Sequence, residues 1–244
     1  MTERLRVLMY HSVSGNGCRD GLTVDNGQLE QHFRYLLTEG YTPILLSDLL
    51  EGYTNNTSLP ENPVLITFDD GYRNNYEIAY PLAEKYQVKM NLFLVPSFII
   101  QGRYKGQPTI GLEDIRRMDP GLVEIGLHSF GHRNYSLMDP AEIEKDLDNC
   151  FMAFRHMDID YQPCLAYPYG AWPKGPDQDL FLRILQAKGI RLAFRIGNRL
   201  NTLPLRQPFL IQRIDVRGDE SFRTFRLAMS YGKKSTGWLA PLLR

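Results

Sequence analysis

The sequence predicts an α/β protein whose parallel strands close into a barrel. Short apolar stretches alternate about seven times with longer stretches of helical spacing, as in βα units around a parallel sheet. Polar clusters directly follow several of the apolar stretches, as catalytic groups do at the ends of barrel strands. A length of 244 residues suits one closed barrel. An open, doubly wound sheet is the alternative that these patterns leave open.

Eight apolar stretches are expected as strands, and the clearest one lies in residues 64–71. It reads Val-Leu-Ile-Thr-Phe-Asp-Asp-Gly, so a short run with β-branched residues ends abruptly in turn chemistry. Runs of this kind are typical of strands buried in a parallel sheet. The other expected strands are residues 5–10, 41–46, 90–95, 122–127, 164–167, 190–195 and 209–216.

Helices are expected between these strands, because apolar residues recur there at helical spacing. Asp25 and Asp139 stand where N-caps are found, and Pro140 suits a first turn. Pro81 predicts a kink in the helix expected at residues 73–86. The first helix, residues 26–39, should bury Leu29, Phe33, Leu36 and Leu37. The remaining helices are expected after Ser47, at 111–118, after Asp139, at 178–188 and at 220–229, with loops at 12–23, 52–63 and 98–110.

Composition limits the classes of protein to which the chain can belong. Acidic and basic residues balance at a net charge of +0, which gives no indication of a nucleic-acid partner. The cysteines Cys18, Cys150 and Cys164 are far apart and odd in number, so neither a disulfide framework nor a cysteine metal site is expected. No apolar run suits a signal-peptide core or a membrane span. We therefore expect a cytoplasmic chain with one domain, residues 1–244, and the sequence leaves its oligomeric state open.

Two adjacent carboxylates, Asp69 and Asp70, end the clearest strand. Neighbouring residues at a strand end point in different directions, so one carboxylate could hold a metal ion while the other takes a proton. The alternative is an ordinary turn, because Asp-Asp-Gly forms turns in many settings.

Two histidines, His128 and His132, follow the strand expected at residues 122–127. Side chains four residues apart share one face if the segment turns helically, and two imidazoles with one carboxylate suit a divalent metal ion with an open position for water. The alternative is a pair of histidines in an ordinary loop.

Two further clusters follow strands. Tyr167, Tyr169 and Trp172 offer flat apolar surface for a sugar ring, and Pro168 with Gly170 makes a tight turn that could aim a backbone N–H at an oxyanion. Packing of these aromatic rings in the core is the alternative. His11 ends the first strand, where either a catalytic or a structural role is open.

These clusters together resemble a known family. The segments that carry the resemblance are residues 67–71 (Thr-Phe-Asp-Asp-Gly), 128–132 (His-Ser-Phe-Gly-His), 168–170 (Pro-Tyr-Gly) and 10–13 (Tyr-His-Ser-Val). The chain resembles the polysaccharide deacetylases of the NodB-homology type, carbohydrate esterase family 4, and within them the branch of the poly-N-acetylglucosamine deacetylases. The resemblance implies an irregular (β/α) barrel of about seven strands, a divalent metal ion and hydrolysis of an N-acetyl group on an amino sugar.

The resemblance also implies roles for individual residues. Asp69 corresponds to the general base. Asp70, His128 and His132 correspond to the metal ligands, and the backbone N–H of Tyr169 would help to hold the oxyanion. A metal ion of this kind polarises a carbonyl and lowers the pKa of a bound water, and Zn²⁺ is favoured, with Ni²⁺ or Co²⁺ as alternatives.

The sequence departs from the family pattern at two positions. Ala166 stands where the family often has the arginine that orients the base, and Leu210 to Arg213 lack the late histidine that often supplies the acid. Arg213, near the end of the last strand, could pair with Asp69 instead. His11 ends a strand that barrel closure would place beside the last one, and it could supply the acid.

The sequence therefore predicts a metal-dependent N-deacetylase whose partner is an N-acetylated sugar or glycan. A cytoplasmic location would favour a small, nucleotide-linked or lipid-linked sugar over a finished polymer. Two alternatives stay open. One is a carbohydrate-binding protein with impaired activity on the same scaffold, which the two departures favour. The other is a hydrolase for a different amide, since a fold does not fix a substrate.

Overall fold

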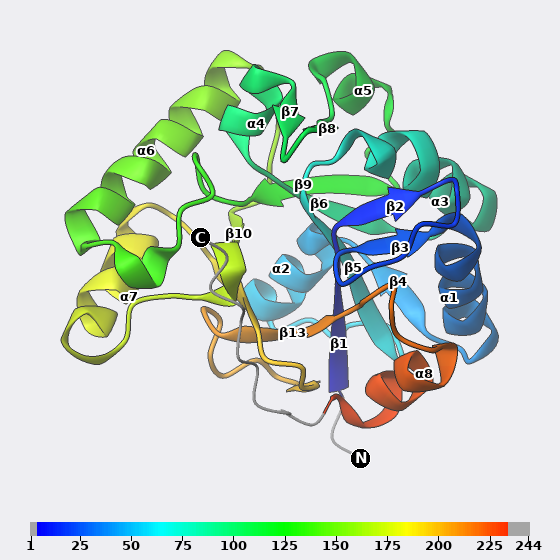
Figure 1. Cartoon of the computed structure of the whole chain (residues 1–244). Coiled ribbons are helices and arrows are strands. Elements are labelled where there is room, and N and C mark those ends of the chain that lie inside the picture. The colour runs from blue at the N-terminus through cyan, green and yellow to red at the C-terminus, as the bar shows by residue number, and fades with distance from the viewer. Residues whose placement is uncertain (1–3, 234–244) are drawn as a thin grey trace.

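The computed structural model of the chain describes residues 4–233, and in them seven parallel strands close into a barrel (Figure 1). Around the barrel these strands are β1 (Arg4–Tyr10), β13 (Ile211–Asp215), β11 (Leu192–Ile196), β10 (Cys164–Ala166), β9 (Val123–Leu127), β6 (Met90–Leu94) and β5 (Pro63–Asp70). Strand β1 pairs in parallel with both β13 and β5, which closes the ring. The predicted barrel is confirmed, and the open doubly wound sheet is excluded.

The barrel is irregular in two respects. Strand β10 is three residues long and meets β9 at one pair, Leu165 with Leu127. Two short strands also extend the sheet beyond the ring: β4 (Thr42–Ile44) runs parallel to β5, and β12 (Asn201–Thr202) runs antiparallel to β1. The sequence analysis expected residues 41–46 as a strand and missed β12, since two residues are too few to show an alternating pattern.

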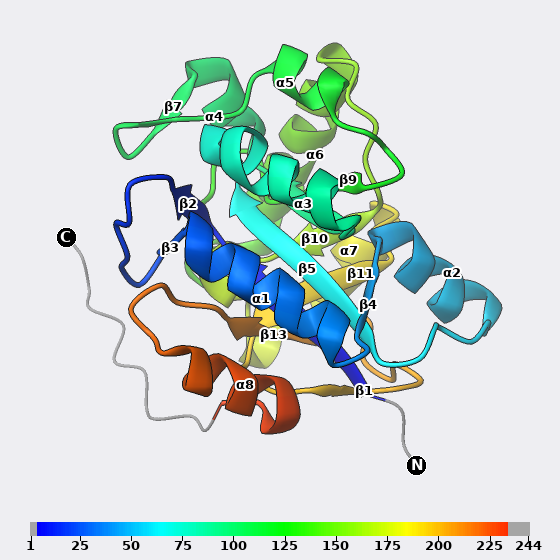
Figure 2. The same cartoon turned by 90° about the vertical axis from the view of Figure 1, so that its right-hand side faces the viewer.

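Helices surround the strands, and Figure 2 shows α1 lying between α3 and α8 over one side of the barrel. The helices are α1 (Asn26–Thr38), α2 (Leu46–Asn55), α3 (Tyr80–Tyr86), α4 (Pro96–Gln101), α5 (Leu112–Arg117), α6 (Pro140–His156), α7 (Gln178–Ala187) and α8 (Phe222–Tyr231). Short turns of helix lie at Asn75–Ala79, Tyr135–Leu137, Pro168–Gly170 and Gly175–Asp177. Within residues 4–233, no helix is long and apolar enough to cross a membrane.

Local sequence signals set most helix boundaries. The carboxylates of Asp25 and Asp139 each accept a backbone N–H of the first turn at 2.8 Å, as predicted for N-caps. Leu37 was expected on the buried face of α1, but it is 40% exposed. The cap of α2 is Leu45, whose N–H bonds to Asp48, so the prediction of Ser47 as cap was wrong.

Proline shapes the helix expected at residues 73–86. Its first part, Asn75–Ala79, is a turn of π-helix, in which the N–H of Tyr80 bonds to the carbonyl of Asn75. Pro81 has no N–H to donate, and an ordinary α-helical ladder is interrupted there. The predicted kink therefore takes the form of a wider turn followed by α3.

Two expected loops contain structure. Within residues 12–23, β2 (Ser12–Ser14) pairs with β3 (Thr23–Asp25). Within residues 98–110, helix α4 ends at Gly102, and β7 (Arg103–Tyr104) and β8 (Gln107–Pro108) form a hairpin. Lys105 and Gly106 both have positive φ, as a two-residue hairpin turn requires. The sequence analysis expected an unbroken loop at residues 98–110, whereas Gly102 ends a helix and Gly106 makes a tight turn.

The alternation of side chains along β5 places the first catalytic candidate inside the barrel. Leu65 belongs to a buried cluster with Val7, Phe93 and Phe194, whereas Ile66 packs in the separate core beneath the helices. Because the side-chain period of a strand is two residues, Asp69 shares the inner face of Leu65 and Thr67. The strand thus carries apolar residues deep in the barrel and a carboxylate at its carboxyl end.

Candidate active site and metal centre

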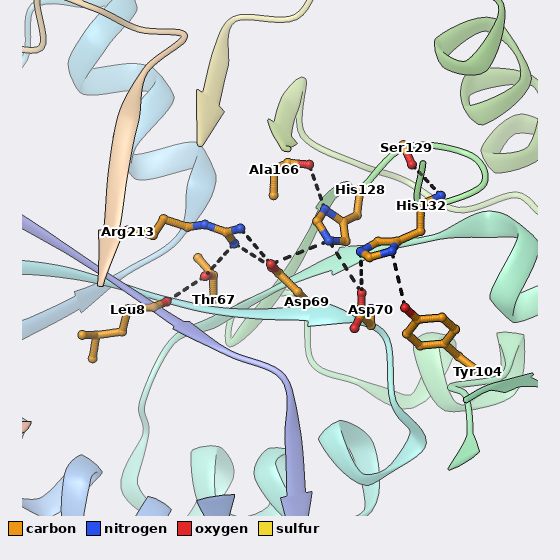
Figure 3. A network of polar contacts seen from close by, with 10 residues as sticks. All are labelled: Leu8, Thr67, Asp69, Asp70, Tyr104, His128, Ser129, His132, Ala166 and Arg213. Atoms are coloured by element: carbon orange, nitrogen blue, oxygen red, sulfur yellow. Dashed lines mark hydrogen bonds and ion pairs between the residues drawn. The ribbon is translucent and has the colours of Figure 1, made fainter. Parts of the chain in front are cut away.

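A pocket of about 510 Å³ opens at the carboxyl ends of the barrel strands. Asp69 and Asp70 at the end of β5, His128 and His132 after β9, and His11 after β1 all contribute to its wall. The structure thus brings together five side chains that come from three strand ends. Figure 3 shows that Asp70, His128 and His132 point toward one another, with Asp69 and Arg213 beside them.

Asp69 is bound through both oxygens to Arg213, which comes from β13. The two guanidinium nitrogens Nη1 and Nη2 donate to Oδ1 and Oδ2 at 2.6 and 2.7 Å, and both residues are buried (Figure 3). The Thr67 hydroxyl lies 3.4 Å from Nη1 and donates to the Leu8 carbonyl at 2.7 Å. Burial acts to raise the pKa of Asp69, but the charge and hydrogen bonds of Arg213, together with His128 and His11, outweigh burial and hold the pKa at about 2. The sequence analysis expected this contact.

Asp70 lies in the opposite electrostatic setting. Its φ is +69°, so the chain leaves strand geometry at this residue. Its Oδ1 atom is buried and has no hydrogen-bond partner among residues 4–233. Burial, reinforced by the neighbouring charge of Asp69, raises the pKa of Asp70 to about 7. A buried carboxylate oxygen without a partner is costly, and a bound cation would remove that cost.

His128 is oriented by a backbone carbonyl. Its Nδ1 lies 2.8 Å from the carbonyl oxygen of Ala166, so Nδ1 carries the proton and Nε2 presents a lone pair. Nε2 points at the two carboxylates, 3.6 Å from Asp70 Oδ1 and 3.7 Å from Asp69 Oδ2. Burial lowers the pKa of His128, which favours the neutral imidazole that metal ions require.

His132 reaches the same point through a turn that is not helical. Ser129 and His132 have φ of +65° and +54°, and the His132 N–H donates to the Ser129 hydroxyl at 2.8 Å. The segment from His128 to His132 is therefore not the helical turn that would place side chains four residues apart on one face, although the two imidazoles do converge. His132 Nε2 lies 3.2 Å from Asp70 Oδ1, and burial with the nearby His128 lowers the pKa of His132 to about 2.

The donor atoms of Asp70, His128 and His132 fit one divalent metal ion. One atom from each residue lies within 4.8 Å of the other two. The set is one carboxylate oxygen and two neutral imidazole nitrogens, which suits zinc and similar ions. The unpartnered Oδ1 of Asp70 lies on this focus, as suits a ligand atom.

His11 lines the pocket beside Asp69. Its strand β1 lies next to β13, as expected from barrel closure. Its backbone carbonyl accepts from the Asn75 amide at 2.7 Å, and its Nδ1 is buried without a hydrogen-bond partner in the described chain. Burial lowers the pKa of His11 to about 4, although the charge of Asp69 acts in the other direction. His11 thus lines the pocket, and no side-chain hydrogen bond among residues 4–233 holds its Nδ1.

The turn at Pro168–Gly170 borders the same pocket. Tyr169 has φ of +60°, and its ring is 57% exposed with its centroid 4.7 Å from that of His132. Gly170 also has positive φ, and a Cβ there would lie 2.5 Å from the Ile196 side chain. Only glycine therefore allows this turn to pack against β11.

Two aromatic residues predicted to face a sugar lie in the core instead. Tyr167 is fully buried, and its hydroxyl donates to the Phe209 carbonyl at 2.9 Å. Trp172 is 7% exposed and packs beside the Tyr167 ring, outside the pocket wall. Their predicted substrate contact is corrected: the strand end places Tyr167 near the mouth, but its ring turns outward to the helices.

Several pocket residues escaped the sequence analysis, and Tyr104, Lys105 and Arg195 are the ones with a bearing on the chemistry of the pocket. The Tyr104 hydroxyl lies 3.5 Å from His132 Nδ1 (Figure 3), and Lys105 follows it at the tip of the β7–β8 hairpin. Arg195 comes from the carboxyl end of β11. The hairpin could have been found from its Lys-Gly turn, and Arg195 from its place at the end of an expected strand.

Comparison with known proteins adds a sequence relationship to this geometry. The polysaccharide deacetylase family profile matches residues 56–196. The chain is 27% identical to YxkH of Bacillus subtilis (strain 168) over 169 residues, which are 69% of this chain and 58% of YxkH. It is 25% identical over 206 residues to the poly-beta-1,6-N-acetyl-D-glucosamine N-deacetylase of Staphylococcus aureus (strain MRSA252), covering 81% of this chain and 69% of that protein. The chain thus spans little more than half the length of YxkH.

Solved structures share the fold over almost the whole chain. The deacetylase PplD of Streptococcus pyogenes, in complex with acetate, superposes with a TM-score of 0.78 at 18% identity over 94% of this chain and 99% of that one. IcaB from Ammonifex degensii superposes with a TM-score of 0.76 at 20% identity over 93% and 96% of the two chains. At these identities the likeness establishes the barrel.

Proposed function

The chain belongs to the polysaccharide deacetylase family, and we propose that it is a metal-dependent hydrolase that removes N-acetyl groups from an amino sugar in a polysaccharide or glycan precursor. One observation carries this proposal. A carboxylate held by its own arginine, Asp69, lies in the same pocket as the convergent ligand set of Asp70, His128 and His132. Hydrolysis of an amide needs a base and an electrophile within reach of one substrate group.

Asp70, His128 and His132 would hold the metal ion, for which Zn²⁺ is our first choice and Ni²⁺ or Co²⁺ the alternatives. When bound, such an ion polarises the acetyl carbonyl and makes water more acidic. The Ala166 carbonyl keeps His128 Nε2 unprotonated for this purpose, and burial keeps both imidazoles neutral.

Asp69 would act as the general base that takes a proton from the attacking water. Arg213 holds the carboxylate in one orientation through two hydrogen bonds and keeps it ionised at neutral pH. This arrangement supplies from β13 the orienting cation that Ala166 cannot provide. It also weighs against the impaired-protein alternative, which the Ala166 substitution had suggested.

Two further roles are proposed for pocket residues. The backbone N–H of Tyr169 would hold the oxyanion that forms when water adds to the carbonyl. His11 would deliver a proton to the leaving nitrogen. Because burial lowers its pKa to about 4, it would do so after taking up a proton in the substrate complex, which the charge of Asp69 favours. Arg213 retains its proton too strongly for that task. The exposed ring of Tyr169 is our candidate for contact with the sugar.

The chemistry of the site and the names of the relatives support one substrate class. The poly-beta-1,6-N-acetyl-D-glucosamine N-deacetylase of Staphylococcus aureus is named for an N-acetylated polymer, so we propose an N-acetylated glucosamine unit as the reacting group. The expected cytoplasmic location stays a prediction, which fractionation of cells would test. The single domain predicted for residues 1–244 also stays a prediction.

Acetate release tests the proposal. The protein is loaded with Zn²⁺, Ni²⁺ or Co²⁺ and incubated with N-acetylglucosamine oligomers and with matched N-formyl and N-propionyl oligomers. We expect acetate and free amine in equal amounts, loss of activity with a chelator, and recovery on adding metal. Binding of the oligomers without product would favour the carbohydrate-binding alternative, and faster release of another acyl group would favour a different amide hydrolase.

A further inference from the structure

The catalytic pocket has a second wall that the proposed reaction does not use. Arg195 and Asn198 from β11 and its following loop, Asp215 from the end of β13, and Lys233 after α8 lie on this wall. They share one cavity with Asp69 and the metal ligands. A substrate larger than one acetamido group would therefore meet them.

Most charged side chains of the pocket have partners within the protein. The recorded pairs are Asp69 with Arg213 at 2.6 Å, Glu220 with Lys233 at 2.5 Å, and Asp219 with Arg217 at 2.6 Å. Asp215 is 6% exposed and has no ion pair of its own in the described part of the chain, but the charges of Lys233 and Arg217 act on its carboxylate. Negative and positive groups thus offset each other on the α8 side of the pocket.

Arg195 differs from these paired cations, because it forms no ion pair with any residue in the range 4–233. It is half-buried, with its guanidinium carbon 4.6 Å from the centroid of the Trp172 ring. Its Nε donates to the Ile196 carbonyl at 3.2 Å. These two contacts fix the plane of the guanidinium while its terminal nitrogens keep their donors for a ligand.

The surroundings of Arg195 disfavour its positive charge. Burial, together with the charge of nearby Arg199, lowers the pKa of Arg195. Lys174 lies over the same Trp172 ring, 4.9 Å from its centroid. Like charges gathered around one partly buried cation destabilise it, and an anionic ligand would reverse that effect.

Lys105 is a second cation of the pocket wall without an ion pair in the described residues. It stands at the tip of the β7–β8 hairpin, and its charge acts on Asp70, His11 and His132. The hairpin thus adds positive charge near the reacting centre. A long, exposed lysine attracts an anion through its charge and does not hold it in a fixed geometry.

We propose that Arg195, assisted by Lys105, binds an oxyanion carried by the substrate, a phosphoryl or carboxylate group on the N-acetylated sugar or on its neighbour. This inference rests on the proposed function and narrows the substrate to an anionic glycan or sugar phosphate. The fixed fork of Arg195 matches two oxygens of either group. A neutral N-acetylglucosamine polymer would leave the arginine without its partner.

The test is binding by isothermal titration to the metal-loaded protein. The probes are N-acetylglucosamine, N-acetylglucosamine 1-phosphate and N-acetylglucosaminuronic acid, which separate a phosphoryl from a carboxylate source. The variants are Arg195→Gln, Arg195→Lys and Lys105→Gln. Arg191→Gln is the matched control, because Arg191 is exposed just before the other end of β11 and contacts Thr54 on α2.

We expect an anionic probe to bind on the order of tenfold or more tightly than the neutral sugar, as charge-assisted bidentate hydrogen bonds allow. Arg195→Gln should remove most of that preference, Arg195→Lys part of it, and Arg191→Gln none. Metal content is measured for each variant. The variants are compared at equal metal content, because phosphate can also bind to the metal ion. Equal affinity for neutral and anionic probes, or an unchanged preference in Arg195→Gln, would overturn the inference.

Failure of this inference and failure of the proposed function look different. If acetate is released from neutral oligomers and Arg195→Gln changes neither affinity nor rate, the hydrolase stands and the oxyanion site is rejected. If no probe is deacetylated but the preference for anions depends on Arg195, the site stands and the hydrolase is rejected.

Discussion

Asp69 and Asp70 are adjacent in the sequence and both buried, yet Asp69 lies against an arginine and Asp70 against two imidazoles (Figure 3). Arg213 binds both oxygens of Asp69 and holds its pKa at about 2. Asp70 faces two imidazoles, keeps an unpartnered oxygen in the described structure, and has a pKa raised to about 7 by burial and by Asp69. The fold therefore supplies a cation to one carboxylate, and in the proposed metal site the other would bind a cation from solution.

The largest effects are expected when each of the two carboxylates is substituted separately. Asp69→Asn should lower the rate of acetate release on the order of 10²–10⁴-fold, because the proton acceptor is lost, while bound metal stays near one equivalent. Asp70→Asn should lose the metal together with the activity, because the only oxygen ligand of the proposed set is weakened. Metal analysis and initial rates check both. Near-normal activity in Asp69→Asn would show that another group is the base.

His11→Ala tests the acid on the Asp69 side of the pocket. The loss should be on the order of 10²-fold for an acetamide, whose amine leaves poorly without a proton, and small for an aryl acetate. His156→Ala, at the exposed end of α6, is the control and should change neither rate. If both substrates slow equally, His11 is structural, and water or a substrate group would be the acid.

Arg213→Lys should have a smaller effect on rate, roughly tenfold to hundredfold, because charge remains but the bidentate geometry that aims Asp69 is lost. Arg213→Gln should also destabilise the fold by roughly 3–5 kcal/mol, because it leaves a buried carboxylate without its partner. Initial rates and urea unfolding measure the two effects. Full activity in both variants would mean that Asp69 is held by other contacts.

The smallest effect is on stability as a function of pH. The folded pKa of Asp69 lies below its ordinary value of 3.8, so this group stabilises the fold above about pH 4, and the stability is lost as pH falls toward 2. The folded pKa of Asp70 lies above 3.8, so the metal-free protein should lose stability as pH rises from about 4 to 7. Thermal unfolding should show this loss of stability with pH in protein freed of metal by a chelator. Metal-loaded protein should show a flatter dependence of stability on pH. Identical profiles would remove Asp70 as a ligand.

The sequence by itself determined the local features of this protein. Strand and helix alternation predicted the barrel, and a short apolar run placed Asp69 and Asp70 at a strand end. Capping chemistry placed the starts of α1 and α6 at Asp25 and Asp139. The strand-end and capping signals lie within a few residues of the structure they predict, because capping and side-chain periodicity act over one turn or one strand.

Tertiary structure decided which distant side chains meet. His128 and His132 converge through two residues of positive φ, which no helical spacing could show. Tyr167 and Asp69 both lie at the carboxyl end of a strand, yet the ring of Tyr167 lies in the core. A shift of one residue in the pairing of a strand exchanges its two faces, so position at a strand end does not decide which way a side chain points. Lys105 and Arg195 enter the pocket from a hairpin and from β11. Such contacts depend on how the barrel closes and in which register, and local patterns in the chain do not contain that information.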